Sequence, residues 1–137
     1  MQMIEQLEGF SAEPYPDPPG SGKFSIGFGH QILPGESFTA ITIEQARALL
    51  AADTQKARNV ITAYIDYPLS TAQRAALTSF VYNIGGEQFL AGTVPAKINR
   101  GDLKAAGATM KEYVHSGGAV SSALVSRRLI ESAPFLA

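Results

Sequence analysis

Apolar residues recur at helical spacing along most of the chain. In residues 1–10, apolar positions three or four apart predict a short helix. Residues 42–64 carry the longest such pattern, and Asp53 is its one polar interruption. Thr42 and Gln45 have the types and spacing of a capping box at its start. The sequence therefore predicts a short first helix and a long one, on the order of 30 Å at the usual rise per residue.

The second half of the chain repeats the helical pattern in shorter stretches. Ser70 and Gln73 form a second possible capping box, before a helix that Gly85–Gly86 is expected to end. Gly117–Gly118 predicts a break close to the end of the chain. Further helices are expected at about 87–91, about 94–99, from Asp102 onward, and at roughly 120–130.

Residues 14–34 differ from the rest because they hold five prolines and four glycines. Proline density excludes a helix from the first part of this stretch, and short apolar pieces such as FSIGF suit a small sheet. Helix outweighs strand and the strands cluster early, which predicts an α+β fold. We expect a sheet lobe at about 12–40 and a helical lobe at about 65–137 plus the N-terminal helix. The long helix would join the lobes, with a cleft between them.

Length, charge and composition narrow the class of protein. A chain of 137 residues suits a single domain, and its net charge of -1 without a long basic run excludes a surface that follows nucleic-acid phosphates. The absence of cysteine excludes disulfides and cysteine-ligated zinc, and the two histidines show no ligand spacing, so no metal or cofactor is expected. The chain shows neither a signal peptide nor an apolar stretch of membrane-spanning length, so stable membrane insertion is not expected.

The candidate chemistry lies in residues 8–30. Glu8 ends the first predicted helix beside apolar side chains, Asp17 lies in the proline-rich loop, and Ser25 follows on a predicted strand. Glycoside hydrolysis needs two carboxyl groups in unlike surroundings, one protonated and one ionised. Glu8 fits the first role and Asp17 the second, while the Ser25 hydroxyl could orient the attacking water. Spacing alone leaves a plain alternative open, in which Glu8 is a solvated charge and Asp17 a turn residue.

A longer series of motifs favours the catalytic interpretation. Glu8-Gly9, Pro14-Tyr15-Pro16-Asp17 and Ser25-Ile26-Gly27-Phe28-Gly29-His30 follow one another in this order. The series resembles the early signature of the phage lysozymes, glycoside hydrolase family 24, which reads Glu-Gly, Ala-Tyr-x-Asp and Gly-x-x-Thr-Ile-Gly-Tyr-Gly-His. The resemblance continues through Asn83-Ile84-Gly85 to the closing Arg127-Arg128-x-x-Glu131, and so covers essentially the whole chain.

The resemblance implies a role for each matching residue. Glu8 becomes the general acid, Asp17 the second carboxylate, and Ser25 takes the place of the family's water-positioning threonine. The family is described as inverting, which needs a carboxyl gap of about 6.5–9.5 Å to hold the water. Ser25 lacks the methyl group that stiffens a threonine rotamer. The loop before it is longer than the family pattern, so Ser21 is an alternative match.

The resemblance also implies contacts with sugars. His30 resembles the family's structural histidine, a hydrogen-bonded packing residue rather than a catalyst. The matching family positions place Tyr82 and Asn83 at the sugar groove. The alternative, in which Tyr82 is a core residue and Asn83 a helix C-cap, stays equally open. The residues expected to border the substrate are Tyr15, His30, Tyr82, Asn83 and Thr93.

Charged residues outside the motifs have simpler interpretations. One of Arg127 and Arg128 is expected to pair with Glu131 within a helix, at three or four residues' spacing. Glu13 and Glu36 are expected to be solvated charges.

The activity that the resemblance implies is hydrolysis of the β-1,4 bond between N-acetylmuramic acid and N-acetylglucosamine in peptidoglycan, for lysis of a bacterium by a phage. The protein would be a monomer in the host cytoplasm and would reach the periplasm and cell wall through a holin-type membrane lesion. One alternative is a lytic transglycosylase, which would use Glu8 with attack by the sugar's own hydroxyl. The other is a non-catalytic saccharide-binding or phage structural protein. The presence of Glu8, Asp17 and the Ser25 hydroxyl argues against this last alternative.

Overall fold

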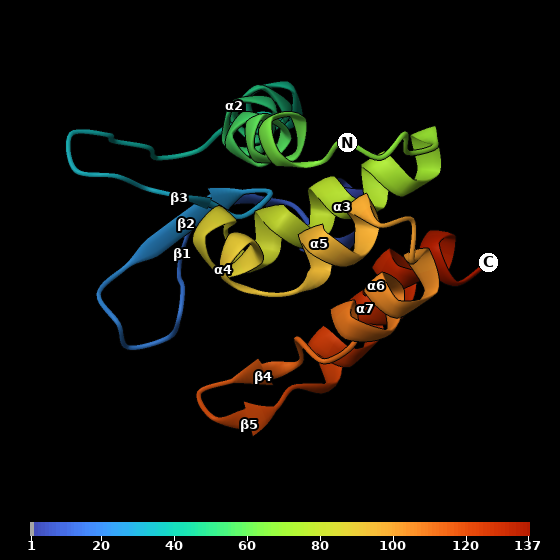
Figure 1. The fold of residues 1–137 in the computed structure, drawn as a ribbon. Helices are drawn as coiled ribbons and strands as arrows, with labels where there is room; N and C mark the ends of the chain where they lie inside the picture. The colour runs from blue at the N-terminus through green and yellow to red at the C-terminus, as the bar shows by residue number, and fades with distance from the viewer. Residues whose placement is uncertain (1) are drawn as a thin grey trace. The chain divides into compact units, whose positions relative to one another are not determined.

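The computed structural model describes residues 2–137, with side chains from Met3 onward. The chain forms two compact units, and the boundary between Gln55 and Lys56 falls within helix α2 (Ile43–Tyr64). Helix predominates and the strands of the larger sheet come early, so the predicted α+β class is confirmed (Figure 1). No helix within the described residues is both long and apolar enough to cross a membrane.

The first unit holds a small antiparallel sheet, drawn in blue in Figure 1. Its strands pair in chain order, and Tyr15 lies opposite Ser25 across the first pair. The register shifts between Ser11 and Tyr15. The sheet predicted within residues 14–34 is therefore confirmed, although its first strand begins earlier, at Ser11. The elements before α2 are α1 (Gln2–Glu8), β1 (Ser11–Pro16), β2 (Phe24–Gly27) and β3 (His30–Gln31).

The predicted capping box opens α2. Thr42 Oγ1 accepts a hydrogen bond of 3.2 Å from the Gln45 backbone, and Gln45 Oε1 accepts one of 2.9 Å from the Thr42 backbone. Buried Ala46 and Ile26 belong to the core of this unit. Gly27 has a φ of 69°, and a Cβ there would lie 3.1 Å from Ala46 Cβ. The close approach of β2 to α2 therefore requires glycine.

After the end of α2, the second unit consists mainly of helices. α3 begins with the predicted Ser70–Gln73 capping box, and Asp102 caps α6 as predicted. α3 ends at Ile84 with Gly85 as its C-cap, and Gly86 already belongs to the next helix, so the predicted Gly85–Gly86 break is one residue long. α3 and α6 both pack on α7 (Figure 1). The helices are α3 (Thr71–Ile84), α4 (Gly86–Ala91), α5 (Val94–Asn99), α6 (Leu103–Met110) and α7 (Ser122–Leu136).

A short hairpin separates α6 from α7. Gly117–Gly118 forms its turn, between β4 (His115–Ser116) and β5 (Ala119–Val120). Both glycines have positive φ, which a tight hairpin turn requires. The apolar pattern predicted a break here but not the strands, since two-residue strands are too short to show alternation.

The last helix was predicted at roughly 120–130, and both predicted bounds are wrong. Val120 lies in β5, and α7 begins only after Ser121, whose Oγ accepts a hydrogen bond of 3.3 Å from the Leu124 backbone. The helix then continues past Pro134 to Leu136. Proline within a helix removes one backbone hydrogen bond. Burial of the Phe135 ring, which is 1% exposed, favours the extra turn.

Candidate active site

Pairing of β1 with β2 brings a carboxylate and a hydroxyl together. Ser25 Oγ in β2 donates a hydrogen bond of 3.0 Å to Oδ2 of Asp17, which follows β1. The Asp17 backbone N–H also donates to the Lys23 carbonyl at 2.9 Å and closes the loop between the strands. Ser25 is buried whereas Asp17 is exposed. The hydroxyl of buried Ser25 therefore holds an oxygen of the exposed Asp17 carboxylate in place.

The alternative hydroxyl, Ser21, serves the loop itself. Its Oγ donates to the Pro18 carbonyl at 2.7 Å and accepts from the Lys23 backbone at 3.1 Å. Both contacts are local and shape the turn. Of the two serines, therefore, only Ser25 is hydrogen-bonded to Asp17 within the described residues.

The negative charges of Glu8 and Asp17 both influence the phenol group of Tyr15. Glu8 is the last residue of α1 and is half-buried, and Tyr15 lies on β1. The pKa of Tyr15 is raised above its ordinary value, first by burial and then by the negative charges of Asp17 and Glu8. The structure thus brings Glu8, Tyr15, Asp17 and Ser25 into one electrostatic neighbourhood of the first unit.

His30 is buried and both of its ring nitrogens are engaged. Nδ1 lies 2.8 Å from Asp53 Oδ2 and Nε2 lies 2.9 Å from Glu36 Oε1. Burial lowers the pKa of His30, but the hydrogen bonds and charges of Glu36 and Asp53 outweigh it, so the pKa is raised. The prediction of a hydrogen-bonded packing residue is confirmed.

The carboxylates around His30 correct the sequence interpretation. Glu36, expected to be a solvated charge, instead contacts His30 and accepts a 2.8 Å hydrogen bond from the Leu33 backbone. These bonds lower the pKa of Glu36, the backbone bond most. The sequence did not identify Asp53 as a partner of His30, although a polar side chain on the apolar face of α2 indicated that Asp53 has a buried polar partner. Among residues 2–137, no three His, Asp or Glu side chains are arranged to hold a metal ion.

A pocket of about 680 Å³ lies within the second unit. Two of the residues expected to border the substrate, Asn83 and Thr93, line it, whereas Tyr82 is half-buried in α3 and is not among its described lining residues. Sequence reasoning missed the contribution of the segment between α6 and α7, which no periodic pattern marked. The further lining residues include Gln88, Glu112, Tyr113, His115 and Arg128.

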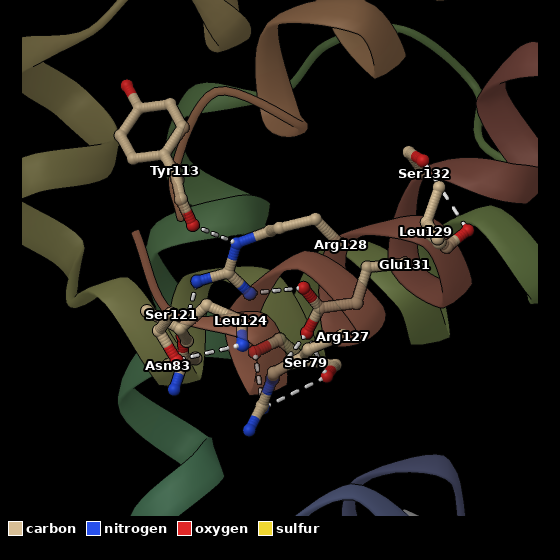
Figure 2. Close-up of polar contacts among 10 residues, drawn as sticks. All are labelled: Ser79, Asn83, Tyr113, Ser121, Leu124, Arg127, Arg128, Leu129, Glu131 and Ser132. Atoms are coloured by element: carbon tan, nitrogen blue, oxygen red, sulfur yellow. Dashed lines mark hydrogen bonds and ion pairs between the residues drawn. The ribbon is translucent and has the colours of Figure 1, made fainter. Parts of the chain in front are cut away.

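A buried ionic cluster includes Arg128, one of the residues that line this pocket (Figure 2). Glu131 is fully buried and accepts hydrogen bonds from Arg127 Nε at 2.9 Å and Arg128 Nη1 at 2.5 Å. Ser79 Oγ donates to the same carboxylate. Pairing of Glu131 with one arginine was predicted, and the structure shows pairing with both. Burial lowers the pKa of Arg128, and Glu131 opposes that change.

Asn83 connects the cluster to the pocket. Its Oδ1 accepts a hydrogen bond from Arg128 Nη2, and its side chain is exposed. The alternative that Asn83 is the C-cap of α3 is wrong. The C-cap is Gly85, whose N–H donates to the Val81 carbonyl.

Comparison with known proteins places the chain in a family. The family model described as phage lysozyme matches residues 5–131. The SAR-endolysin of Enterobacteria phage PA-2 is 35% identical over 126 residues, which cover 91% of this chain and 74% of the relative. The SAR-endolysin of Bacteriophage PS119 is 34% identical over 128 residues, with the same two coverages.

Solved structures resemble the whole chain. The endolysin from Escherichia coli O157:H7 phage FAHEc1 superposes with a TM-score of 0.88 at 27% identity, covering 98% of this chain and 89% of that one. The muramidase domain of SpmX from Asticaccaulis excentricus superposes with a TM-score of 0.87 at 28% identity, covering 99% and 93%.

Proposed function

Because the chain belongs to the phage lysozyme family, we propose that it cleaves the β-1,4 bond between N-acetylmuramic acid and N-acetylglucosamine by means of Glu8, Asp17 and Ser25. Family membership makes the protein a glycoside hydrolase that degrades peptidoglycan in phage lysis, with a lysozyme-like α+β fold. The proposal adds the bond, the residues and the stereochemistry. Residues 1–137 would act as one catalytic domain.

The observation that carries the proposal is the 3.0 Å hydrogen bond from Ser25 Oγ to Asp17 Oδ2. Because Ser25 gives its hydrogen to the carboxylate, its oxygen can accept a hydrogen bond from a water held by Asp17. That water attacks the anomeric carbon and passes a proton to Asp17, while Glu8 donates its proton to the leaving glycosidic oxygen. Attack on the face opposite the acid inverts the configuration of the sugar.

Substrate contacts follow from the positions already described. The second-unit pocket has a volume within the usual range for ligand sites, about 300–1,000 Å³. Asn83 and Thr93 in this pocket, with Tyr82 in the same helix as Asn83, would contact sugars. Tyr15 would contact the sugar beside the carboxylates. His30 would act through the position of β3, since both its ring nitrogens are bonded within the protein.

Clearing of a peptidoglycan suspension tests the three catalytic assignments. Glu8→Gln and Asp17→Asn keep the side-chain shape but remove the proton exchange, and each should lower the rate by about 10²–10⁴-fold. Ser25→Ala should lower it about 10²-fold by releasing the water from its position. Glu13→Gln is the matched control, because Glu13 is an exposed carboxylate on β1. Glu8→Gln with full activity would overturn the proposal.

The products distinguish hydrolysis from transglycosylation. Mass spectrometry of digested peptidoglycan should show reducing-end sugars. A 1,6-anhydro ring would instead identify a lytic transglycosylase, in which Asp17 and Ser25 need not hold a water.

The proposal extends to the route of the enzyme. A monomer would remain in the host cytoplasm and reach the periplasm and cell wall through a holin-type lesion of the membrane. Expression alone should then leave cells intact, and added chloroform should lyse them within minutes. Lysis without any permeabilising agent would contradict this route.

A further inference from the structure

The polarity of the Asn83 amide is fixed by its neighbour. A carboxamide has an oxygen that accepts and a nitrogen that donates, with nearly the same shape, so the hydrogen-bond partners decide which end points where. Arg128 has only donors, and its Nη2 therefore faces the Asn83 oxygen. Figure 2 shows the Asn83 nitrogen on the side of the amide away from the guanidinium. Among residues 2–137, no hydrogen-bond acceptor is found for this nitrogen.

The guanidinium that fixes this amide is itself held on three sides. Arg128 Nε donates to the Tyr113 carbonyl at 2.8 Å and Nη1 donates to Glu131 at 2.5 Å. The guanidinium carbon lies 5.1 Å from the centre of the Phe80 ring. The side chain is 2% exposed, so it cannot turn toward solvent. A flipped Asn83 amide would oppose two donors and lose the hydrogen bond.

The charge of Arg128 favours the same orientation of the Asn83 amide. Its buried guanidinium donates hydrogen bonds to the Glu131 carboxylate on one side and to the Asn83 oxygen on the other. A hydrogen-bond chain that ends on the Asn83 oxygen polarises the amide and strengthens its nitrogen as a donor. The pocket therefore presents two directed donor hydrogens at Asn83. A sugar hydroxyl can donate or accept, whereas an acetamido carbonyl only accepts and so matches a group of fixed polarity.

We propose that Arg128 is a positioning residue for substrate binding, which holds Asn83 so that its nitrogen donates to an acetamido carbonyl of the glycan. The inference rests on the proposed function, because it assumes that the second-unit pocket receives peptidoglycan sugars. Asn83 touches the substrate and Arg128 acts through it. Removal of either side of the contact therefore weakens sugar binding before it affects the chemical step.

Binding measurements separate this role from catalysis. Glu8→Gln protein is titrated by NMR with tri-N-acetylchitotriose and with cellotriose, which has the same linkage and hydroxyls but no acetamido groups. Asn83→Asp keeps an acceptor toward Arg128 but replaces the donor nitrogen with an oxygen. It should raise the Kd for the acetylated trimer about 5–10-fold, the loss of one hydrogen bond, without lowering the melting temperature. Cellotriose binding should be weaker and unchanged by this substitution.

Two neighbouring arginines provide matched variants. Arg128→Lys should raise the Kd for the acetylated trimer several-fold, whereas Arg127→Lys, which also disturbs Glu131 but leaves Asn83 in place, should not. In an Asn83→Ala background, Arg128→Lys should have no further effect on the Kd.

If Arg128→Lys and Asn83→Ala have additive effects on the Kd, or if Asn83→Asp leaves the Kd unchanged, the inference is overturned. If Arg128→Lys does not fold, Asn83→Asp decides alone. Because the titration needs no turnover, these outcomes are distinct from a fully active Glu8→Gln enzyme, which would overturn the proposed function instead.

Discussion

At His30, burial and hydrogen bonding act on the same proton in opposite directions. Burial favours the neutral ring, whereas Glu36 on one side and Asp53 on the other favour the imidazolium. The charged partners prevail and raise the pKa of His30, and the ring joins the loop after β3 to helix α2. Within the first unit, this pair of contacts makes the stability dependent on pH.

The pH dependence has a defined window. A raised histidine pKa stabilises the folded state fully below the unfolded value of 6.5, and the contribution is lost as pH rises through the folded pKa. The lowered pKa of Glu36 contributes above 4.5 and is lost as pH falls through the folded value. The free energies of urea unfolding of the wild type and of His30→Gln should therefore differ most between pH 4.5 and pH 6.5. A difference that grows above pH 8 would contradict this assignment.

Single residues of the site were predictable to different degrees. Asp17 and Ser25 were expected to act together because the motif series resembles that of the phage lysozymes, and the pairing of β1 with β2 brings them into contact. The partners of His30 depend on where α2 packs, which no local pattern records. Asp53 was visible as a polar position on an apolar face, but its partner was not. For Glu36 no local signal existed at all.

At the scale of elements, one glycine sets how closely α6 approaches α7. A Cβ at Gly107 would lie 2.9 Å from Leu136 Cδ2 and 3.1 Å from Phe135 Cβ. Both neighbours lie in the last turn of α7, the part that continues past Pro134. The contact explains a glycine in the interior of a helix, where alanine would otherwise be favoured.

Gly107→Ala tests this contact. Alanine would stabilise an isolated helix by about 1 kcal/mol, but the clash with α7 costs about 1–3 kcal/mol, so a net loss of unfolding free energy is expected. Ala108→Gly, at the next and exposed position of α6, measures the propensity term by itself. Urea denaturation of both variants supplies the comparison. A more stable Gly107→Ala protein would mean that the two helices pack less closely.

Helix starts that carry a capping box were predicted from the sequence, whereas the end of α7 was not. Capping boxes at Thr42 and Ser70 are local, since one side chain bonds a backbone group three residues away. The end of α7 depends instead on burial of Phe135, which outweighs the proline before it. The β4–β5 hairpin has only two residues in each strand, so its turn glycines were its one signal.

At the scale of the molecule, charge is nearly balanced. The net charge of -1 gives little long-range attraction to an anionic wall. Recognition must therefore arise from short-range contacts, which salt screens less than it screens distant charges. Between about 0.01 and 0.1 M salt the Debye length shrinks from about 30 to about 10 Å.

The rate of wall clearing should accordingly change less than about twofold over that range of salt. Replacing the exposed Glu13 and Glu44 with lysine removes two negative charges and adds two positive ones to the net charge of -1, and this variant should clear walls faster at low salt and lose the gain at high salt. A steep salt dependence of the wild type would show that a local cluster of positive charge directs it to the wall.

The buried group of Arg127, Arg128 and Glu131 also constrains how this chain can evolve. Loss of the carboxylate alone would leave the buried Arg128 guanidinium without its ion-pair partner, and burial of an unpaired charge is strongly destabilising. Joint replacement of an ion group by apolar residues of similar volume is often tolerated. Among descendants of this chain, the three positions should therefore change together, as one inherited unit.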